Sequence, residues 1–188
     1  MSLYIKVVIA SWAIFSLYWL VSAFGSKRNT NPRLNRFMGI RLAIFALAVL
    51  LFRFLSIQNH SFHNHLVSSN KLVLGSGLII LLLGLLLAVW ARVYLGKNWG
   101  MPMSQKQDTE LVTSGPYRYV RHPIYLGFLL AILGSTLASS IFWLIIFAIS
   151  GAYFIYSALM EEKHLTIQFP KVYPSYKFKT KMLVPFIF

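Results

Sequence analysis

The sequence contains no cysteine among its 188 residues and only four acidic side chains. The absence of cysteine excludes disulfides, thiolate metal ligands and a cysteine nucleophile. The four acids, Asp108, Glu110, Glu161 and Glu162, stand against 18 lysines and arginines, which gives a formal net charge of +14. Charged residues make up only 12% of the chain, about half the share found in an ordinary soluble domain. The sequence therefore has fewer charged side chains than a soluble protein of this size normally has.

Long apolar segments replace the missing charges, and 57% of the residues are hydrophobic. A helix needs about 20 apolar residues to cross a bilayer. Five segments approach that length: residues 3–24, 37–57, 72–94, 123–138 and 141–160. We therefore expect an all-α, polytopic membrane protein with about five transmembrane helices and a cytosolic C-terminal helical segment. Ser139 and Ser140 leave room only for a tight turn, so the last two helices should form an antiparallel hairpin.

The basic residues predict how these helices are oriented. They gather around the first loop, the third loop and the tail: Lys27, Arg28, Arg33, Arg36, Arg41, Lys97, Lys106, Arg118, Arg121, Lys163, Lys171, Lys177, Lys179 and Lys181. Because cytoplasmic loops carry the excess of lysine and arginine, these three segments should face the cytoplasm and the N-terminus the outside. Basic residues at helix ends suit anionic lipid headgroups, so we do not expect nucleic acid as a partner.

Two polar clusters stand at the rims of apolar segments. The first comprises Gly115-Pro116-Tyr117-Arg118 and Arg121-His122-Pro123-Ile124-Tyr125-Leu126-Gly127. Pro123 suits the first turn of a helix, which makes His122 an N-cap residue and turns Tyr125 inward. Each of these residues alone could be an interfacial anchor or a helix cap. Together they indicate a functional site, because polar groups are costly in a membrane unless they are paired or line a cavity.

The second cluster is the pair Glu161 and Glu162, which we expect at the C-terminus of the fifth span. The helix dipole disfavours negative charge there, so a cation should lie nearby: a basic side chain or a bound cationic ligand. Neighbouring helical residues point about 100° apart, so one glutamate should contact a ligand while the other holds an arginine. One helical hairpin separates the two clusters, and this should bring them to the same side of the membrane.

Other motifs predict no further chemistry. His60, His63 and His65 lie on an outer loop without an acid or cysteine nearby, so we expect solvated histidines and no metal site. Gly75, Gly77 and Gly84 should permit close helix packing. The loop around Trp99 could offer an aromatic platform or an interfacial anchor.

From Gly96 onward, the combined motif resembles the superfamily of isoprenylcysteine carboxyl methyltransferases and phospholipid methyltransferases, which are integral membrane enzymes that use S-adenosylmethionine. The motif joins residues 115–127 to Glu161-Glu162, to Tyr173 and Tyr176, and to a late Pro185. We expect one integral membrane domain over residues 1–188, with N-terminal helices in 1–94, and the resemblance implies a catalytic half with the cofactor pocket in 95–188.

The resemblance also implies roles for individual residues. Cofactor contacts would come from Gly115, Tyr117, His122, Tyr125, Leu126, Glu161 and Glu162, and the catalytic set would be Arg121, Glu161 and Glu162. One glutamate would bind the α-ammonium of S-adenosylmethionine, and Arg121 or Arg118 would face its carboxylate.

The expected function is S-adenosylmethionine-dependent methyl transfer to a lipidic or prenylated acceptor, by O-methylation of a carboxylate or N-methylation of an amine. The acceptor would enter from the bilayer and the cofactor from the cytoplasm, among membrane lipids. Two alternatives stay open: a membrane reductase of the sterol-reductase type that uses reduced nicotinamide dinucleotide, and a membrane protein without enzymatic activity.

Overall fold

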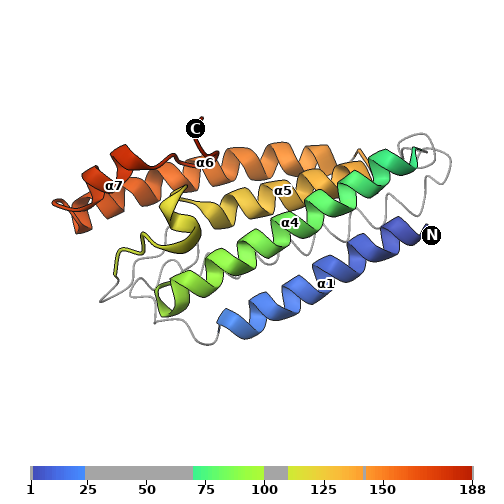
Figure 1. Ribbon diagram of the computed structural model, residues 1–188, viewed down its shortest axis with the longest axis horizontal. Helices are drawn as coiled ribbons and strands as arrows, with labels where there is room; N and C mark the ends of the chain where they lie inside the picture. The colour runs from blue at the N-terminus through green and yellow to red at the C-terminus, as the bar shows by residue number, and fades with distance from the viewer. Residues whose placement is uncertain (1, 24–69, 100–109, 142, 188) are drawn as a thin grey trace.

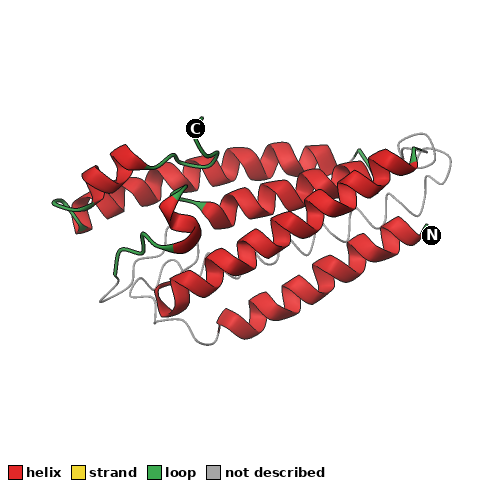
Figure 2. Cartoon of the chain, viewed as in Figure 1, coloured by secondary structure: helices red, strands yellow, loops and turns green. Residues whose placement is uncertain are grey.

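The computed structural model describes residues 2–23, 70–99, 110–141 and 143–187. Four long helices run alongside one another (Figure 1): α1 (Leu3–Ala23), α4 (Lys71–Leu95), α5 (Pro123–Ala138) and α6 (Trp143–Gln168). Three short elements complete the described fold: the 3-10 helices η1 (Gly96–Asn98) and η2 (Gly115–Arg118), and helix α7 (Tyr173–Lys179). Figure 2 shows helices joined by loops, with no strand in the described ranges.

The expected all-α membrane fold is confirmed. Helices α1, α4 and α6 are long and apolar enough to cross a membrane, and α5 is a shorter apolar helix. Three of the expected spans agree with α1, α4 and α5 to within one residue at each end. The expected span at 37–57 and the first-loop basic residues lie outside the described residues.

Helix α6 differs from expectation at its C-terminal end. The apolar segment was expected to end at residue 160, but α6 continues through Glu161 and Glu162 to Gln168. Hydrophobicity marks where a helix can meet lipid, while good helix formers such as glutamate and lysine continue the helix into polar surroundings. The glutamate pair therefore lies inside α6 and not at its end.

Glycines allow α4 and α5 to pack backbone against backbone. A Cβ atom added at Gly84 would lie 2.5 Å from the backbone nitrogen of Ala131, and one added at Gly77 would lie 2.5 Å from that of Ala138. Small residues at helix interfaces permit this close approach in membranes. Among the described residues, nothing lies within 4 Å of the Cβ position of Gly75, so in this part of the chain the expected packing role is confirmed for Gly77 and Gly84 and wrong for Gly75.

A buried polar bond joins α1 to α5. The indole nitrogen of Trp12 donates to the hydroxyl of Ser135 at 3.0 Å. Aromatic rings surround this bond, with Phe128 of α5 packed edge-on against Phe15 and Trp19 of α1. Because unpaired polar groups are costly in an apolar environment, this pairing fixes how α1 lies against α5.

The helix directions gather both polar clusters at one end of the bundle. The C-terminal ends of α1, α4 and α6, the start of α5, and α7 lie together, opposite the end that holds the N-terminus (Figure 1). The hairpin of α5 and α6 turns at the opposite end. His122 and Glu161 are thereby brought to the same end of the bundle, as the hairpin predicted.

The glycine contacts lead to a test of helix packing. Gly84→Ala should lower the free energy of unfolding by about 1–3 kcal/mol, because the new methyl group must push the Ala131 backbone away. Gly75→Ala is the matched control and should leave stability unchanged or slightly raised, since its Cβ position is open. Thermal unfolding in detergent measures both, and equal losses would contradict the packing account.

Candidate functional site

Three stacked rings form the centre of the candidate site. His122 stands at the N-cap of α5, just before Pro123, and its ring stacks on Tyr125 with centroids 5.3 Å apart and planes 4° apart. Tyr125 also stacks on Phe154 of α6, with centroids 4.7 Å apart. His122 and Tyr125 are both buried. The stack holds the phenol of Tyr125 in one orientation across the two helices.

Glu161 of α6 contacts two of the three stacked side chains. The hydroxyl of Tyr125 donates to Glu161 Oε1 at 2.5 Å. The Nδ1 atom of His122 lies 3.5 Å from Glu161 Oε2. The Glu161 side chain nevertheless keeps 28% of its surface exposed. One carboxylate is thus held by two site residues and still reaches solvent.

Glu162 has a different environment, although it is the next residue. Its side chain is only 3% exposed, and its oxygens lie 2.6 Å from Arg121 Nε and 2.7 Å from Lys177 Nζ. A cation near the acid pair was expected, and Arg121 was one of the candidates. The helix-end explanation was wrong, because α6 continues beyond the pair to Gln168. Burial of the carboxylate is what requires these cations.

Arg121 is directed entirely toward protein groups. Besides the Glu162 carboxylate, its Nη1 atom donates to the carbonyl of Lys177 at 3.2 Å and to the carbonyl of Thr180. The same guanidinium therefore joins α6 to α7 and to Thr180, the residue that follows α7. Arg118 lies at the surface and forms no part of this cluster.

Backbone hydrogen bonds fasten the tail beside the site. The amide of Arg121 donates to the carbonyl of Lys181 at 2.8 Å, and the amide of His122 donates to that of Met182 at 3.0 Å. The first of these bonds belongs to a parallel bridge between Val120 and Lys181. Met182 is buried in a cluster that includes Tyr125. The residues before α5 and the tail thus form one wall.

The remaining expected site residues lie around this wall. Gly115 has φ +59°, and a Cβ atom there would meet the ring of Tyr94 at 2.5 Å, so a side chain is excluded. Tyr117 is buried in η2, and its carbonyl accepts a 2.7 Å hydrogen bond from the hydroxyl of Tyr176. Burial raises the pKa of Tyr117 well above its ordinary value, so the phenol stays protonated. The amide of Leu126 donates to the His122 carbonyl inside α5.

The protonation of His122 depends on the two carboxylates. Burial alone would lower its pKa, but the facing groups of Glu161 and Glu162 outweigh burial and raise the pKa above its ordinary 6.5. Its Nε2 atom lies 3.6 Å from Glu162 Oε1, an ion-pair contact longer than a hydrogen bond, and has no hydrogen-bond partner among the described residues. The site therefore contains a buried imidazole nitrogen that can still form a hydrogen bond.

Sequence reasoning missed two residues of this cluster. Phe154 precedes Glu161 by two helical turns, a spacing that places both on one face of α6 and could have indicated the contact. Lys177 is one of several lysines in the tail, and nothing local distinguishes it. The Trp99 ring is buried against Trp19 and under the Arg92 guanidinium, so it serves packing.

No metal site appears in the part of the chain that the structure describes, where no group of three or more histidine, cysteine, aspartate or glutamate residues could hold an ion. His60, His63 and His65 lie outside the described residues. The cluster combines a part-exposed carboxylate, flat aromatic faces and an imidazole nitrogen that has no hydrogen-bond partner in the described part of the chain. Such a set suits a flat, cationic organic ligand, because carboxylates and aromatic faces both attract positive charge.

The two glutamates should differ in their effect on stability. Glu162→Gln should lower the free energy of unfolding by about 3 kcal/mol, because it leaves the buried Arg121 guanidinium without its counter-charge. Glu161→Gln should cost clearly less, since that side chain is partly exposed. Chemical denaturation in detergent measures both variants. Equal costs would contradict the division between a structural and a ligand-facing glutamate.

The raised pKa of His122 predicts a dependence of stability on pH. A histidine whose pKa is higher in the folded state stabilises the fold fully below its unfolded pKa, and this contribution is lost as pH rises through the folded pKa. The thermal midpoint should therefore fall as pH is raised above 6.5. His122→Asn should remove this component of the pH dependence. An unchanged profile in the variant would show that other groups cause the fall.

Comparison with known proteins gives relatives that are all methyltransferases. A family model for phospholipid methyltransferase matches residues 71–172. The protein-S-isoprenylcysteine O-methyltransferase of Schizosaccharomyces pombe is 32% identical over 116 residues, which are 60% of this chain and 49% of that protein. The methanethiol S-methyltransferase of Crocosphaera subtropica is 32% identical over 85 residues, which are 44% of this chain and 33% of the relative. The methanethiol S-methyltransferase of a Pseudomonas species is 39% identical over 69 residues, which are 37% of this chain and 26% of that relative.

A solved structure supports the fold. The eukaryotic intramembrane Ras methyltransferase, isoprenylcysteine carboxyl methyltransferase, superposes with a TM-score of 0.60 at 22% identity, over 78% of this chain and 53% of that one. The chain spans about half or less of the length of the curated relatives it matches. The family match covers α4 to the start of the tail, including both glutamates and the ring stack. This chain belongs to the phospholipid methyltransferase family.

Proposed function

We propose that this protein transfers a methyl group from S-adenosylmethionine to a lipophilic acceptor. The observation that carries the proposal is the contact of buried His122 and Tyr125 with the part-exposed carboxylate of Glu161 at one end of an apolar bundle. Family membership supplies the reaction class, since the family is one of phospholipid methyltransferases.

The residues of the cluster fit such a cofactor. S-adenosylmethionine carries an ammonium and a sulfonium, and it has a flat adenine ring. Glu161 offers a carboxylate with 28% of its side-chain surface exposed, whereas both oxygens of Glu162 lie in a buried cluster with Arg121 and Lys177. We therefore assign the α-ammonium to Glu161. Glu162 and Arg121 become positioning residues, which hold α6 and the tail in place.

The other residues of the proposed site would line the cofactor. The imidazole Nε2 of His122 can form one further hydrogen bond, and the faces of the Tyr125 stack suit a sulfonium or an adenine. Tyr117, Gly115 and Leu126 would contribute mainly backbone atoms and the shape of the site wall. Arg121 is directed toward Glu162 and tail carbonyls, so we do not assign it to the cofactor's carboxylate.

The reaction requires little proton transfer by the protein. When bound, the cofactor supplies a methyl group already activated on its sulfonium. The chain contributes alignment and exclusion of water, which suffice to accelerate an in-line displacement. Glu161 holds the charged end, the aromatic stack fixes the plane, and the bridged tail closes one wall. A carboxylate or a neutral amine can attack without a strong general base.

The acceptor would reach the site sideways from the bilayer, as a lipidic or prenylated carboxylate or amine. The basic residues around the site end of the bundle favour a cytoplasmic location. A second acceptor class, small hydrophobic thiols, is favoured by the two relatives named methanethiol S-methyltransferases. A nicotinamide-dependent reductase is disfavoured, because every relative described above is a methyltransferase.

Cofactor binding tests the assignment directly. Purified protein in detergent should bind S-adenosylmethionine by isothermal titration calorimetry, and Glu161→Gln should weaken binding by roughly 10-fold or more, because a charge-assisted bond is lost. His122→Ala should weaken it as well. Lys97→Gln, an exposed position at the same end, is the control. Binding that is unchanged in both site variants would refute the site.

Acceptor identity can be tested with a methyl-labelled cofactor and three acceptor classes: a prenylated cysteine, an aminophospholipid and a small thiol. The proposal expects transfer to at least one class, with product lost in Glu161→Gln. Cofactor binding without transfer to any of them would contradict the proposed acceptors and leave the cofactor site in place. Oxidation of reduced nicotinamide dinucleotide would instead favour the reductase.

A further inference from the structure

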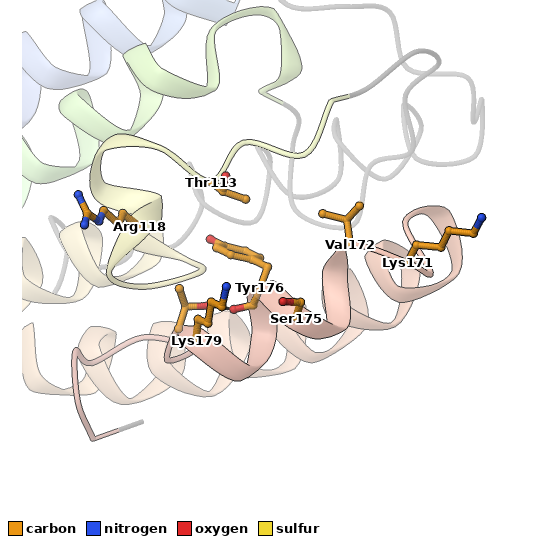
Figure 3. A pocket seen from close by; sticks show the side chains of 8 residues that line it. Thr113, Arg118, Lys171, Val172, Ser175, Tyr176 and Lys179 are labelled. Atoms are coloured by element: carbon orange, nitrogen blue, oxygen red, sulfur yellow. Dashed lines mark hydrogen bonds between the residues drawn. The ribbon is translucent and has the colours of Figure 1, made fainter.

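A second concave surface lies beside the candidate site and shares no side chain with the ring stack. A groove of about 620 Å³ runs between α7 and the chain from Thr113 to Arg118 (Figure 3). Its floor is formed by Ser175, Tyr176 and Lys179 of α7. The Tyr176 hydroxyl, bonded to the Tyr117 carbonyl, ties the two sides together.

The described lining of this groove is positively charged. In Figure 3, Arg118 lies at one end of the groove and Lys171 at the other. Lys179, Tyr176 and Ser175 lie between these two ends. The lining also includes the hydroxyl groups of Thr113 and Thr180 but, among the described residues, no carboxylate. Guanidinium, ammonium and hydroxyl donors together are the groups that bind phosphate oxygens.

The position of the groove favours a ligand at the membrane surface. Most of its lining residues, from Lys171 to Thr180, follow Gln168, where α6 ends beyond its apolar part. Large apolar side chains near it are exposed, with Tyr119 at 56%, Val172 at 56% and Phe178 at 92% of their surface. Exposed aromatic and aliphatic groups next to lysines are typical of segments that lie against anionic headgroups.

We propose that this groove binds a phosphate ester, carried by the headgroup of an anionic phospholipid or by a soluble phosphorylated molecule. The neighbouring exposed apolar residues favour the lipid as the source. This binding does not depend on methyl transfer, because the groove lies outside the ring stack and its occupancy can be measured without turnover. An occupied groove would also hold α7 against the membrane surface.

Native mass spectrometry of the full chain in neutral detergent tests the proposal with three probes. Phosphatidylglycerol should bind, diacylglycerol with the same tails and no phosphate should not, and glycerol 3-phosphate reports on a soluble source. Arg118→Gln/Lys179→Gln should weaken phosphatidylglycerol binding roughly 10- to 30-fold, since each cation near a membrane surface contributes roughly fivefold. Lys97→Gln/Lys163→Gln removes the same charge from exposed positions elsewhere and should bind like the wild type.

The outcomes separate the alternatives. Phosphatidylglycerol binding that glycerol 3-phosphate does not displace supports the lipid source, and displacement supports the soluble source. Equal losses in the two double variants would indicate unspecific charge attraction and overturn the proposal. Displacement by S-adenosylmethionine would assign the groove to the methyl donor and overturn it as well.

A footprinting experiment avoids any folding defect of the variants. Wild-type protein is treated with an amine-acylating reagent, with and without phosphatidylglycerol or glycerol 3-phosphate. The probe should protect Lys179 from acylation several-fold, while Lys97 and Lys163 react as before. Equal reactivity of Lys179 with and without both probes would overturn the proposal.

Discussion

The buried carboxylate of Glu162 is the constraint on which the site end of the molecule depends. Its side chain is 3% exposed, and a charge in that position is tolerated only with partners of opposite sign. Arg121 comes from the chain before α5 and Lys177 from α7, so the requirement joins three segments that are distant in sequence. The tail can satisfy it only by folding back against α6. The ion cluster thus helps to hold the tail against the candidate site.

Two adjacent glutamates acquire different roles because a helix turns them about 100° apart. Glu162 points into the ion cluster, and Glu161 points to Tyr125 and to solvent. The division places a structural charge directly behind a ligand-facing one. In the proposed enzyme, the first would hold the second in place. The basic groove between the chain from Thr113 to Arg118 and α7 extends the polar surface at this end of the bundle.

Much of the fold could be predicted, because it depends on local properties of the sequence. The lengths of the apolar segments located α1, α4 and α5, and the Ser139-Ser140 turn indicated the hairpin. The errors have one physical source. Whether α6 stops at 160, and whether Gly75 meets a neighbour, depends on which groups lie across from these residues. Hydropathy and residue type carry no information about those partners.

By itself the sequence determined an apolar helical bundle with a histidine, a tyrosine and two glutamates at one end, because bilayer thickness and a short turn leave few alternatives. The tertiary structure alone decided which glutamate is buried, that Lys177 and not another tail lysine pairs with it, and that Phe154 completes the ring stack. Such choices depend on distances of a few ångströms between segments far apart in the chain. Only the packed helices set those distances.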